Sequence, residues 1–224
     1  MTRLGLTQRV TVVEEYGERR DCLDQEWTTL LEGSGYTPVP LPNEIDDVDG
    51  YLESLGLDGI VLTSGNDLAH LEQASNPAPE RDRFETAVLD WALDGGIPVC
   101  GVCRGLEFLN VYFGGSLSRV EGHVATEHPV EFDSIPRPDS DASGGTPPLL
   151  ERIDVNSYHG YGIRPDDVAD PLVAVGTAPD DTVECLLHET APVCGIMWHP
   201  ERETPSTEVD RQLFQWLFGG GTHD

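Results

Sequence analysis

The first half of the chain alternates short apolar runs with longer stretches of helical character. The apolar runs are residues 3–10, 37–42, 58–67 and 97–103. The helical stretches that follow them are residues 15–36, 51–57, 79–96 and 104–115. Apolar strands that alternate with helices form a parallel sheet covered on both faces. We therefore expect an α/β fold with a central, mostly parallel sheet.

The pattern changes after residue 115. Six stretches of strand character follow without a long helix between them: SLSRV, HPVEF, IDVNSYH, LVAVGTA, TVECLLHE and VCGIMWH. We expect antiparallel pairing among these strands, and a final helix only at 207–218. Residues 137–148 are rich in Gly, Pro, Ser and Asp, which predicts an exposed loop. Neither half has a complete pattern of its own, so the sequence predicts one domain over 1–218 and a flexible tail at 219–224.

The charge is strongly acidic, with 41 Asp and Glu against 13 basic residues and a net charge of −28. The acidic residues are spread along the whole chain, which favours an acidic surface adapted to concentrated salt over an acidic tail. Such a surface opposes nucleic-acid binding, which needs basic patches. Every basic residue is Arg, so chemistry that depends on a lysine Schiff base is excluded.

This charge predicts a salt-dependent stability. At molar salt the Debye length falls to about 3 Å, so repulsion between surface carboxylates is screened. We expect the melting temperature to rise steeply with KCl, as measured by circular dichroism in a salt series. A flat curve would contradict the halophilic interpretation.

Two features bear on the compartment. No apolar run approaches the roughly 20 residues of a membrane helix, and no signal peptide is recognisable at the N-terminus. The chain has five cysteines, an odd and low number for its length. That count fits a reducing cytoplasm better than a disulfide scaffold. We expect a cytoplasmic protein that does not bind membranes.

The stretch PVCGVCRGLEFLN holds Cys100 and Cys103, for which several interpretations stand. A metal site needs two further ligands; His123 and His128 are available, but nothing else is paired. A redox dithiol needs both sulfurs accessible, whereas Cys100 falls inside an apolar strand. Both cysteines could also be ordinary core residues.

A nucleophile explains more of this stretch. Gly101-Val102-Cys103-Arg104-Gly105 has the form Gly-x-Cys-x-Gly between an apolar strand and a helix. It is the thiol counterpart of the Gly-x-Ser-x-Gly turn, in which small residues relieve crowding around a strained nucleophile. The helix N-terminus supplies free N–H groups and partial positive charge, which favour a thiolate and an oxyanion.

A cysteine nucleophile requires a base and a group that orients the base. His199 follows the apolar run CGIMW, and Glu201 stands two residues further on. Both side chains can reach one site past the end of a strand. By itself this pair is equally compatible with two solvent-exposed residues.

Three sequence motifs, in this order along the chain, resemble those of a known family: GVCRG, NSYHGYGI and GIMWHPE. They are similar to the class I glutamine amidotransferase-like superfamily, and most to its γ-glutamyl hydrolase branch. The resemblance spans nearly the whole chain and implies a flavodoxin-like three-layer sandwich. LTSGND matches the Gly-rich strand end of the family, where Ser64-Gly65 replaces the usual Gly-Gly.

The resemblance implies roles for individual residues. It implies a catalytic triad of Cys103, His199 and Glu201, and an oxyanion hole formed by the backbone N–H groups of Gly65 and Arg104. It requires neither a metal nor an organic cofactor.

Further residues are implied as substrate-binding. Glu107 stands where amidotransferases commonly have a Gln that holds the substrate α-amino group, and a solvated helix residue is the alternative. Asn156, Ser157, Tyr158 and His159 fall in the block that borders the glutamyl pocket. Relatives often have His-His-Gln where this chain has His159-Gly160-Tyr161, so the role of His159 stays open.

The N-terminal stretch resembles a narrower subgroup that includes γ-glutamyl-CDP-amidate hydrolases of surface-glycan biosynthesis. In that case Arg9, Arg19 and Arg20 would face a diphosphate, since Arg makes forked contacts to phosphate oxygens. The alternative is helical salt bridges to neighbouring acidic residues.

The leading hypothesis is therefore a hydrolase of γ-glutamyl amides that forms a glutamyl thioester. Its partner is a small γ-glutamyl substrate or glutamine. One alternative is a glutaminase subunit that delivers ammonia to a separate synthase. The other is a non-catalytic binding protein on the same fold. A homodimer is compatible with all three hypotheses.

Overall fold

The computed structural model describes residues 1–132, 152–202 and 207–219. The predicted loop at 137–148 and nearly all of the predicted tail lie outside these ranges. The strands are β1 (Arg3–Thr7), β2 (Arg9–Val13), β3 (Glu18–Cys22), β4 (Thr37–Leu41), β5 (Gly59–Leu62), β6 (Val99–Val102), β7 (Ser118–Arg119), β8 (Val124–Phe132), β9 (Arg152–Tyr158), β10 (Tyr161–Gly162), β11 (Leu172–Thr177), β12 (Val183–His188) and β13 (Val193–Ile196). The helices are α1 (Gln25–Gly33), α2 (Val48–Leu55), α3 (Pro79–Gly95), α4 (Arg104–Tyr112) and α5 (Glu208–Phe218), with short 3₁₀ turns η1 (Pro165–Asp167) and η2 (Pro200–Arg202).

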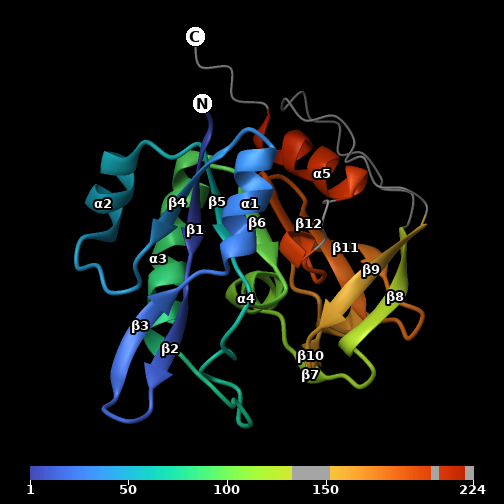
Figure 1. The fold of residues 1–224 in the computed structure, drawn as a ribbon. Helices are drawn as coiled ribbons and strands as arrows, with labels where there is room; N and C mark the ends of the chain where they lie inside the picture. Colours follow the sequence, from blue (N-terminus) through green and yellow to red (C-terminus); the bar gives the residue numbers. More distant parts are fainter. Residues whose placement is uncertain (133–151, 203–206, 220–224) are drawn as a thin grey trace.

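One nine-stranded sheet runs through the molecule in the order β4-β1-β5-β6-β13-β12-β11-β8-β9 (Figure 1). The strands from β4 to β13 are parallel neighbours. The strands from β13 to β9 pair antiparallel. This arrangement confirms the α/β prediction, with antiparallel strands added by the second half of the chain.

The core lies on both faces of the sheet, because the central strands are apolar on both sides. Along β6, Val99 belongs to one buried apolar cluster and Cys100 to the other. Side chains of successive strand residues point to opposite faces, so a continuous apolar strand needs cover on both. Helices α1 and α5 pack in the cluster of Cys100, and α2 and α3 in that of Val99. The predicted layers are confirmed.

The predicted helix over 15–36 is wrong in its first part. Residues 18–22 form β3, which pairs antiparallel with β2 as a hairpin (Figure 1). The β-branched run of β2 favours a strand, and Gly17, with φ of 73°, closes the turn. The helix begins only at Gln25, where the Asp24 side chain accepts a hydrogen bond from the backbone N–H of Glu26 at 3.2 Å. An N-cap of this kind fixes a helix start.

The predicted strand at 3–10 is interrupted at Gln8, since residues 3–7 form β1 of the large sheet and Arg9 begins β2 of the hairpin. Other predicted elements differ only in extent. The predicted helix at 51–57 begins at Val48, after the N-cap Asp47, and ends at Gly56 in the left-handed conformation. The predicted strand SLSRV shortens to β7, which pairs with β10 in a small separate sheet. Among the described residues, no helix is long and apolar enough to cross a membrane.

Candidate active site

Cys103 stands at the turn between β6 and α4. Its backbone φ is 53° and ψ is −106°, a region that residues other than glycine rarely adopt. Its N–H donates to the carbonyl oxygen of Ile196 at 2.8 Å, so the turn is fixed to the neighbouring strand β13. The predicted strained strand-to-helix turn is confirmed.

The turn around Cys103 requires glycine at both flanking positions, because neighbouring backbone atoms leave no room for a Cβ atom. A Cβ atom on Gly101 would lie 2.6 Å from the carbonyl oxygen of Gly105. A Cβ atom on Gly105 would collide with the carbonyl oxygen of Leu62, at the end of β5. The Gly-x-Cys-x-Gly pattern therefore lets α4 start directly against β5 and β6, with Cys103 at their carboxyl ends.

The Cys103 side chain is largely shielded from water, since the residue is only 8% exposed. Burial raises the pKa of its thiol well above the usual value, and the charges of Glu107 and Glu201 raise it further. The backbone N–H of Arg104 acts in the opposite direction, but it does not reverse the shift. The helix end thus favours the thiolate, as expected, but burial and the two carboxylates outweigh it, so Cys103 needs a partner that removes its proton.

His199 follows β13, the strand next to β6, so it comes at the same edge of the sheet as Cys103. β13 and β6 are parallel, with Ile196 opposite Val102. His199 Nδ1 is 2.8 Å from Glu201 Oε1, and both side chains are almost fully buried. His199 Nε2 has no hydrogen-bond partner among the described residues. The solvent-exposed alternative for this pair is excluded, and one ring nitrogen is left for a reacting group.

Asn156 fixes the position of His199. Its side-chain amide donates to the carbonyl oxygen of His199 at 2.9 Å, and its Oδ1 accepts from the N–H of His199 at 2.9 Å. Tyr158, two residues on, meets the His199 ring edge-on at 5.5 Å between centroids. The Arg202 guanidinium lies 4.2 Å from the Tyr158 ring centre. Asn156 is thus turned toward the backbone of His199, while Tyr158 is part of the rim of the site.

Gly65 follows β5, next to α4 in the fold. Its φ of 86° lies in the left-handed region that favours glycine, and a Cβ atom there would lie 2.9 Å from Arg9 Cδ. The Arg81 guanidinium donates to the carbonyl oxygens of Ser64 at 3.0 Å and Gly65 at 2.7 Å. Because Arg81 binds both carbonyl oxygens, it holds the backbone of this loop in one orientation.

A buried network of ionised side chains supports the loop and the Cys103 turn. Arg81 pairs with Glu85 at 2.8 Å, both fully buried, and Arg104 pairs with Glu85 and Asp82. Burial lowers the pKa of Arg81 to about 10, which still leaves it protonated at neutral pH. This network was not predicted from the sequence. The signal was present, because Arg81 and Glu85 are four residues apart on the apolar side of a predicted helix.

Glu107 stands one turn into α4, where its N–H donates to the carbonyl oxygen of Cys103 at 3.0 Å. It is buried, which rules out the alternative of a solvated helix residue. Burial raises the pKa of its carboxyl group to about 7, although the charges of His159 and Arg104 act in the opposite direction. A buried carboxyl group with this pKa, four residues after the candidate nucleophile, is typical of a functional position.

Ser157 and His159 contact a separate group of histidines. Ser157 Oγ donates to the carbonyl oxygen of His123 at 2.8 Å. His159 Nε2 lies 3.4 Å from a carboxylate oxygen of Glu184. Neither contact was expected from the sequence, which gave both residues a place beside the glutamyl pocket.

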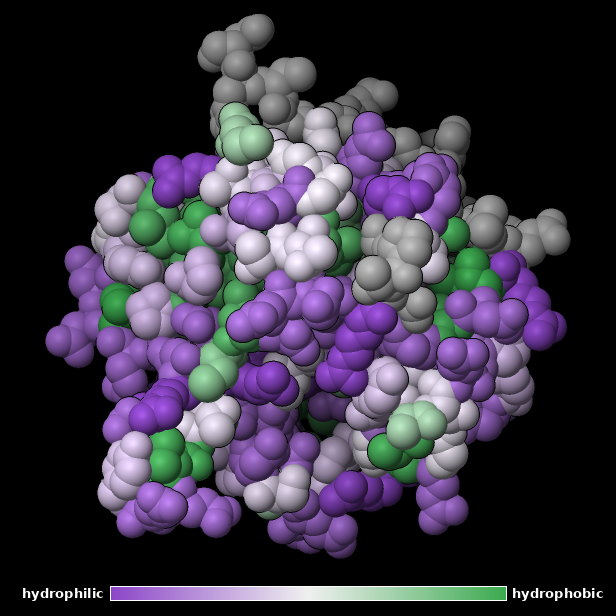
Figure 2. Space-filling model, in the orientation of Figure 1, coloured by the Kyte–Doolittle hydropathy of each residue, from purple (hydrophilic) through white to green (hydrophobic). Residues whose placement is uncertain are grey.

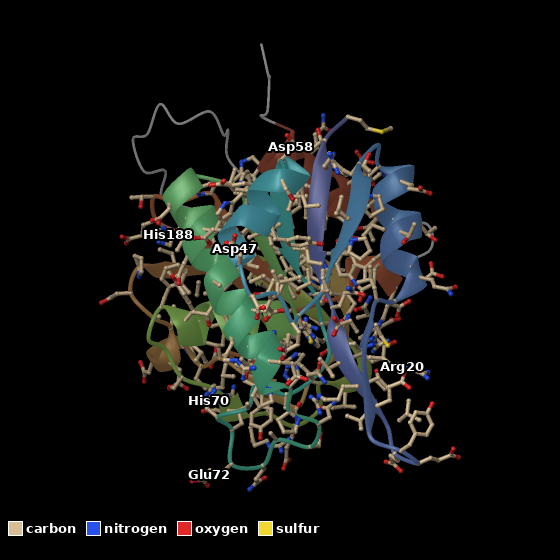
Figure 3. All side chains as sticks on the ribbon, turned by 90° about the vertical axis from the view of Figure 1, so that its left-hand side faces the viewer. Arg20, Asp47, Asp58, His70, Glu72 and His188 are labelled. Atoms are coloured by element: carbon tan, nitrogen blue, oxygen red, sulfur yellow. The ribbon has the colours of Figure 1, made fainter. Side chains whose placement is uncertain are left out.

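The three N-terminal arginines have different surroundings. Arg9 is on β2 against Gly65, and it has no ion-pair partner among the described residues. Arg19 pairs with Glu80, and Arg20 pairs with Glu18 at 2.6 Å. Arg20 lies on the outer part of the hairpin (Figure 3). The salt bridge to Glu18 considered from the sequence is present for Arg20, but within a strand and not a helix. Of the three arginines, Arg9 is the one next to the candidate site.

The face of the molecule that carries these elements is hollowed. Figure 2 shows a hollow below α4, between the β2–β3 hairpin and the β7–β10 pair, with mostly hydrophilic residues around it. The carboxyl edge of the parallel strands is where ligands bind in α/β folds. Cys103, His199 and Gly65 all follow such strand ends.

Comparisons with known proteins agree with this geometry. The profile of the Peptidase C26 family matches residues 4–201. A γ-glutamyl-CDP-amidate hydrolase of Campylobacter jejuni is 32% identical over 96% of this chain and 96% of its own. The γ-glutamyl-γ-aminobutyrate hydrolase PuuD of Escherichia coli is 31% identical over 92% and 89%.

A solved structure has the same fold. The glutamine amidotransferase of Thermotoga maritima superposes with a TM-score of 0.63 over 96% of this chain and 82% of its own, at 17% identity. The family profile and both relatives cover nearly all of the sequence, including the blocks around Cys103 and His199. The chain therefore belongs to the peptidase C26 family of class I glutamine amidotransferase-like hydrolases.

Proposed function

We propose that this protein hydrolyses γ-glutamyl amide bonds through a thioester on Cys103. One observation carries the proposal. A buried His199, oriented by Glu201 at 2.8 Å, has an unpartnered ring nitrogen and follows the strand next to the one that carries Cys103 at its strained end. A nucleophile, a base and a group that orients the base are the parts that acyl transfer requires.

The chemistry follows from these positions. His199 Nε2 takes the proton of the Cys103 thiol, and the resulting imidazolium is stabilised by the Glu201 carboxylate. The thiolate attacks the γ-carbonyl carbon, and the backbone N–H groups of Gly65 and Arg104 stabilise the oxyanion. His199 then protonates the leaving nitrogen, which departs as an amine or amide. Water, deprotonated by His199, attacks the thioester, and glutamate is released.

For the substrate we propose a γ-glutamyl nucleotide amidate, used in the decoration of surface glycans. Support comes from the Campylobacter jejuni relative, whose name states that activity. Further support comes from Arg9, a cation without an ion-pair partner among the described residues that contacts the Gly65 loop. Its guanidinium is suited to a phosphate group on the leaving side of the substrate.

The position of Glu107 leads to a prediction about how the glutamyl part of the substrate is bound. Its carboxyl group is suited to the substrate α-ammonium group, and a charge-assisted hydrogen bond of this kind contributes about 1.5–3 kcal/mol. We expect Glu107→Gln to raise KM about tenfold or more, while kcat changes only a few-fold, in steady-state assays of glutamate release. The exposed Glu189→Gln is the matched control and should leave KM unchanged. An unchanged KM in Glu107→Gln would contradict the charge-assisted contact, because the amide of Gln could then hold the α-ammonium group equally well.

The proposed function is tested with a substrate panel. Purified protein is incubated at low and high KCl with glutamine, γ-glutamyl peptides and a γ-glutamyl nucleotide amidate, and glutamate release is measured. Preference for the nucleotide amidate supports the proposal. Release from glutamine alone would instead favour a glutaminase subunit that supplies ammonia to a separate synthase. No release from any of these compounds at either salt concentration would contradict the proposed function.

A further inference from the structure

A second cluster of functional side chains lies on the other side of β9. It consists of His123, His128, His159 and Glu184, whose facing donor atoms all lie within 4.8 Å of one another. His123 precedes β8, His128 lies in β8, His159 follows β9 and Glu184 lies in β12. We propose that these four residues bind a divalent transition-metal ion of the Zn²⁺ class. This inference is independent of the proposed hydrolase function.

The distances between Glu184 and the three histidine rings fit a shared metal ion better than direct hydrogen bonds. Glu184 Oε1 lies 3.6 Å from His123 Nδ1, 3.7 Å from His128 Nε2 and 3.4 Å from His159 Nε2. These separations are long for hydrogen bonds between a ring nitrogen and a carboxylate. Four tetrahedral ligands about 2.0–2.1 Å from Zn²⁺ lie roughly 3.3–3.4 Å from one another. A small inward movement of the side chains would therefore complete a tetrahedral site.

The facing atoms lack other partners. His123 Nδ1, His128 Nε2, His159 Nε2 and both carboxylate oxygens of Glu184 make no hydrogen bond within the described structure. Glu184 is 0% exposed and the His159 side chain 1%. Each buried polar group without a partner costs about 1–3 kcal/mol. A cation at the centre of the cluster would satisfy the buried carboxylate and the facing ring nitrogens together.

In each histidine ring, one nitrogen faces Glu184 and the other faces outward. The partner of the outward nitrogen determines which of the two carries the proton. His123 Nε2 lies 3.2 Å from Asp180 Oδ2, His128 Nδ1 lies 3.2 Å from its neighbour's carbonyl oxygen, and His159 Nδ1 lies 2.7 Å from the carbonyl oxygen of Tyr161. Oxygen acceptors on this side place the ring proton there. In a neutral imidazole the inner nitrogen then carries a lone pair, as in histidines that bind metal ions. Three lone pairs directed at one carboxylate repel it unless a cation lies between them.

Three nitrogens and one oxygen favour Zn²⁺, and four protein ligands are typical of a closed, structural site. The ion would connect β8, β9 and β12 next to the candidate active site. β9 also carries Asn156, which fixes the backbone of His199. The site would thus stabilise one wall of the catalytic pocket without taking part in the reaction.

The test uses the full chain in KCl buffer. Metal content is measured after purification, the protein is stripped with a chelator, and Zn²⁺ or Co²⁺ is titrated back. We expect one ion per chain, a higher melting temperature, and Co²⁺ absorption of a tetrahedral nitrogen–oxygen site. A thiolate-to-cobalt charge-transfer band would assign the ion to cysteines and overturn the proposal. Failure to bind either ion would also overturn it.

Two variants and a control test the ligands. Glu184→Gln and His128→Gln should weaken Zn²⁺ binding at least about 100-fold, since even outer partners of metal ligands contribute 10–100-fold. His70→Ala should bind as wild type, because His70 is exposed in the loop after β5 (Figure 3). Wild-type affinity in both ligand variants would contradict the site. If a variant does not fold, the Co²⁺ spectrum of the wild type still decides between nitrogen–oxygen and sulfur ligands.

Discussion

Replacing Cys103 by alanine is expected to reduce glutamate release by about 10⁴-fold or more, because loss of a nucleophile removes the covalent route. The thiol is mostly buried, and its pKa is raised. In the proposed mechanism, activity depends on transfer of its proton to His199, and no other described cysteine lies at this turn. The measurement is kcat/KM for the preferred substrate, with unfolding curves to show that the variant is folded.

Cys100→Ala is the matched control for this prediction. Cys100 lies three residues earlier, within β6, and is buried in the apolar core. We expect its activity to stay within a few-fold of the wild type, with some loss of stability from the lost sulfur. Hydrolysis that persists in Cys103→Ala, or is lost equally in Cys100→Ala, would reject Cys103 as the nucleophile.

Replacing Glu85 by glutamine is expected to lower the free energy of unfolding by about 3–5 kcal/mol, the usual cost of breaking a buried ion pair from one side. Glu85 is fully buried between Arg81 and Arg104. Burial raises the pKa of its carboxyl group, but the two arginines outweigh this and hold it below the usual value. The variant would leave two buried guanidinium groups with too little negative charge. Urea unfolding measures the effect.

Glu44→Gln provides the comparison, because Glu44 pairs with Arg83 at 3.5 Å with both side chains largely exposed. Surface pairs of this kind contribute about 0–1 kcal/mol. Glu85→Gln should also lower activity, since Arg81 orients the Gly65 carbonyl and Arg104 belongs to the Cys103 turn. Equal stability losses in the two variants would show that the buried network has no special role.

The central part of the fold was predictable from local patterns. Continuous apolar runs such as β5 and β6 can be satisfied only in a sheet covered on both faces, and Gly101 and Gly105 identify the turn around Cys103. The β2–β3 hairpin was not predictable in the same way. Its residues Glu18 to Asp21 are polar and fit a helix surface equally well, so only pairing with the run after Arg9 decides the outcome.

The candidate site was predictable where residues follow strand ends, and less so where long-range packing decides. His199 and Glu201 were found because they come directly after an apolar run. The role of Asn156 depends on β9 reaching the backbone of His199, which no local pattern indicates. The histidine cluster was missed for the same reason, since Glu184 lies far in sequence from His123 and is hidden in an ordinary strand pattern.

The central claim is that the reaction passes through a glutamyl thioester on Cys103, and hydroxylamine partitioning tests it most directly. At a fixed hydroxylamine concentration, the ratio of γ-glutamyl hydroxamate to glutamate is measured for several γ-glutamyl amides with different leaving groups. A common acyl-enzyme predicts the same ratio for every substrate, and neither product in Cys103→Ala. A ratio that changes with the leaving group would show that water attacks the substrate directly, and would contradict the account.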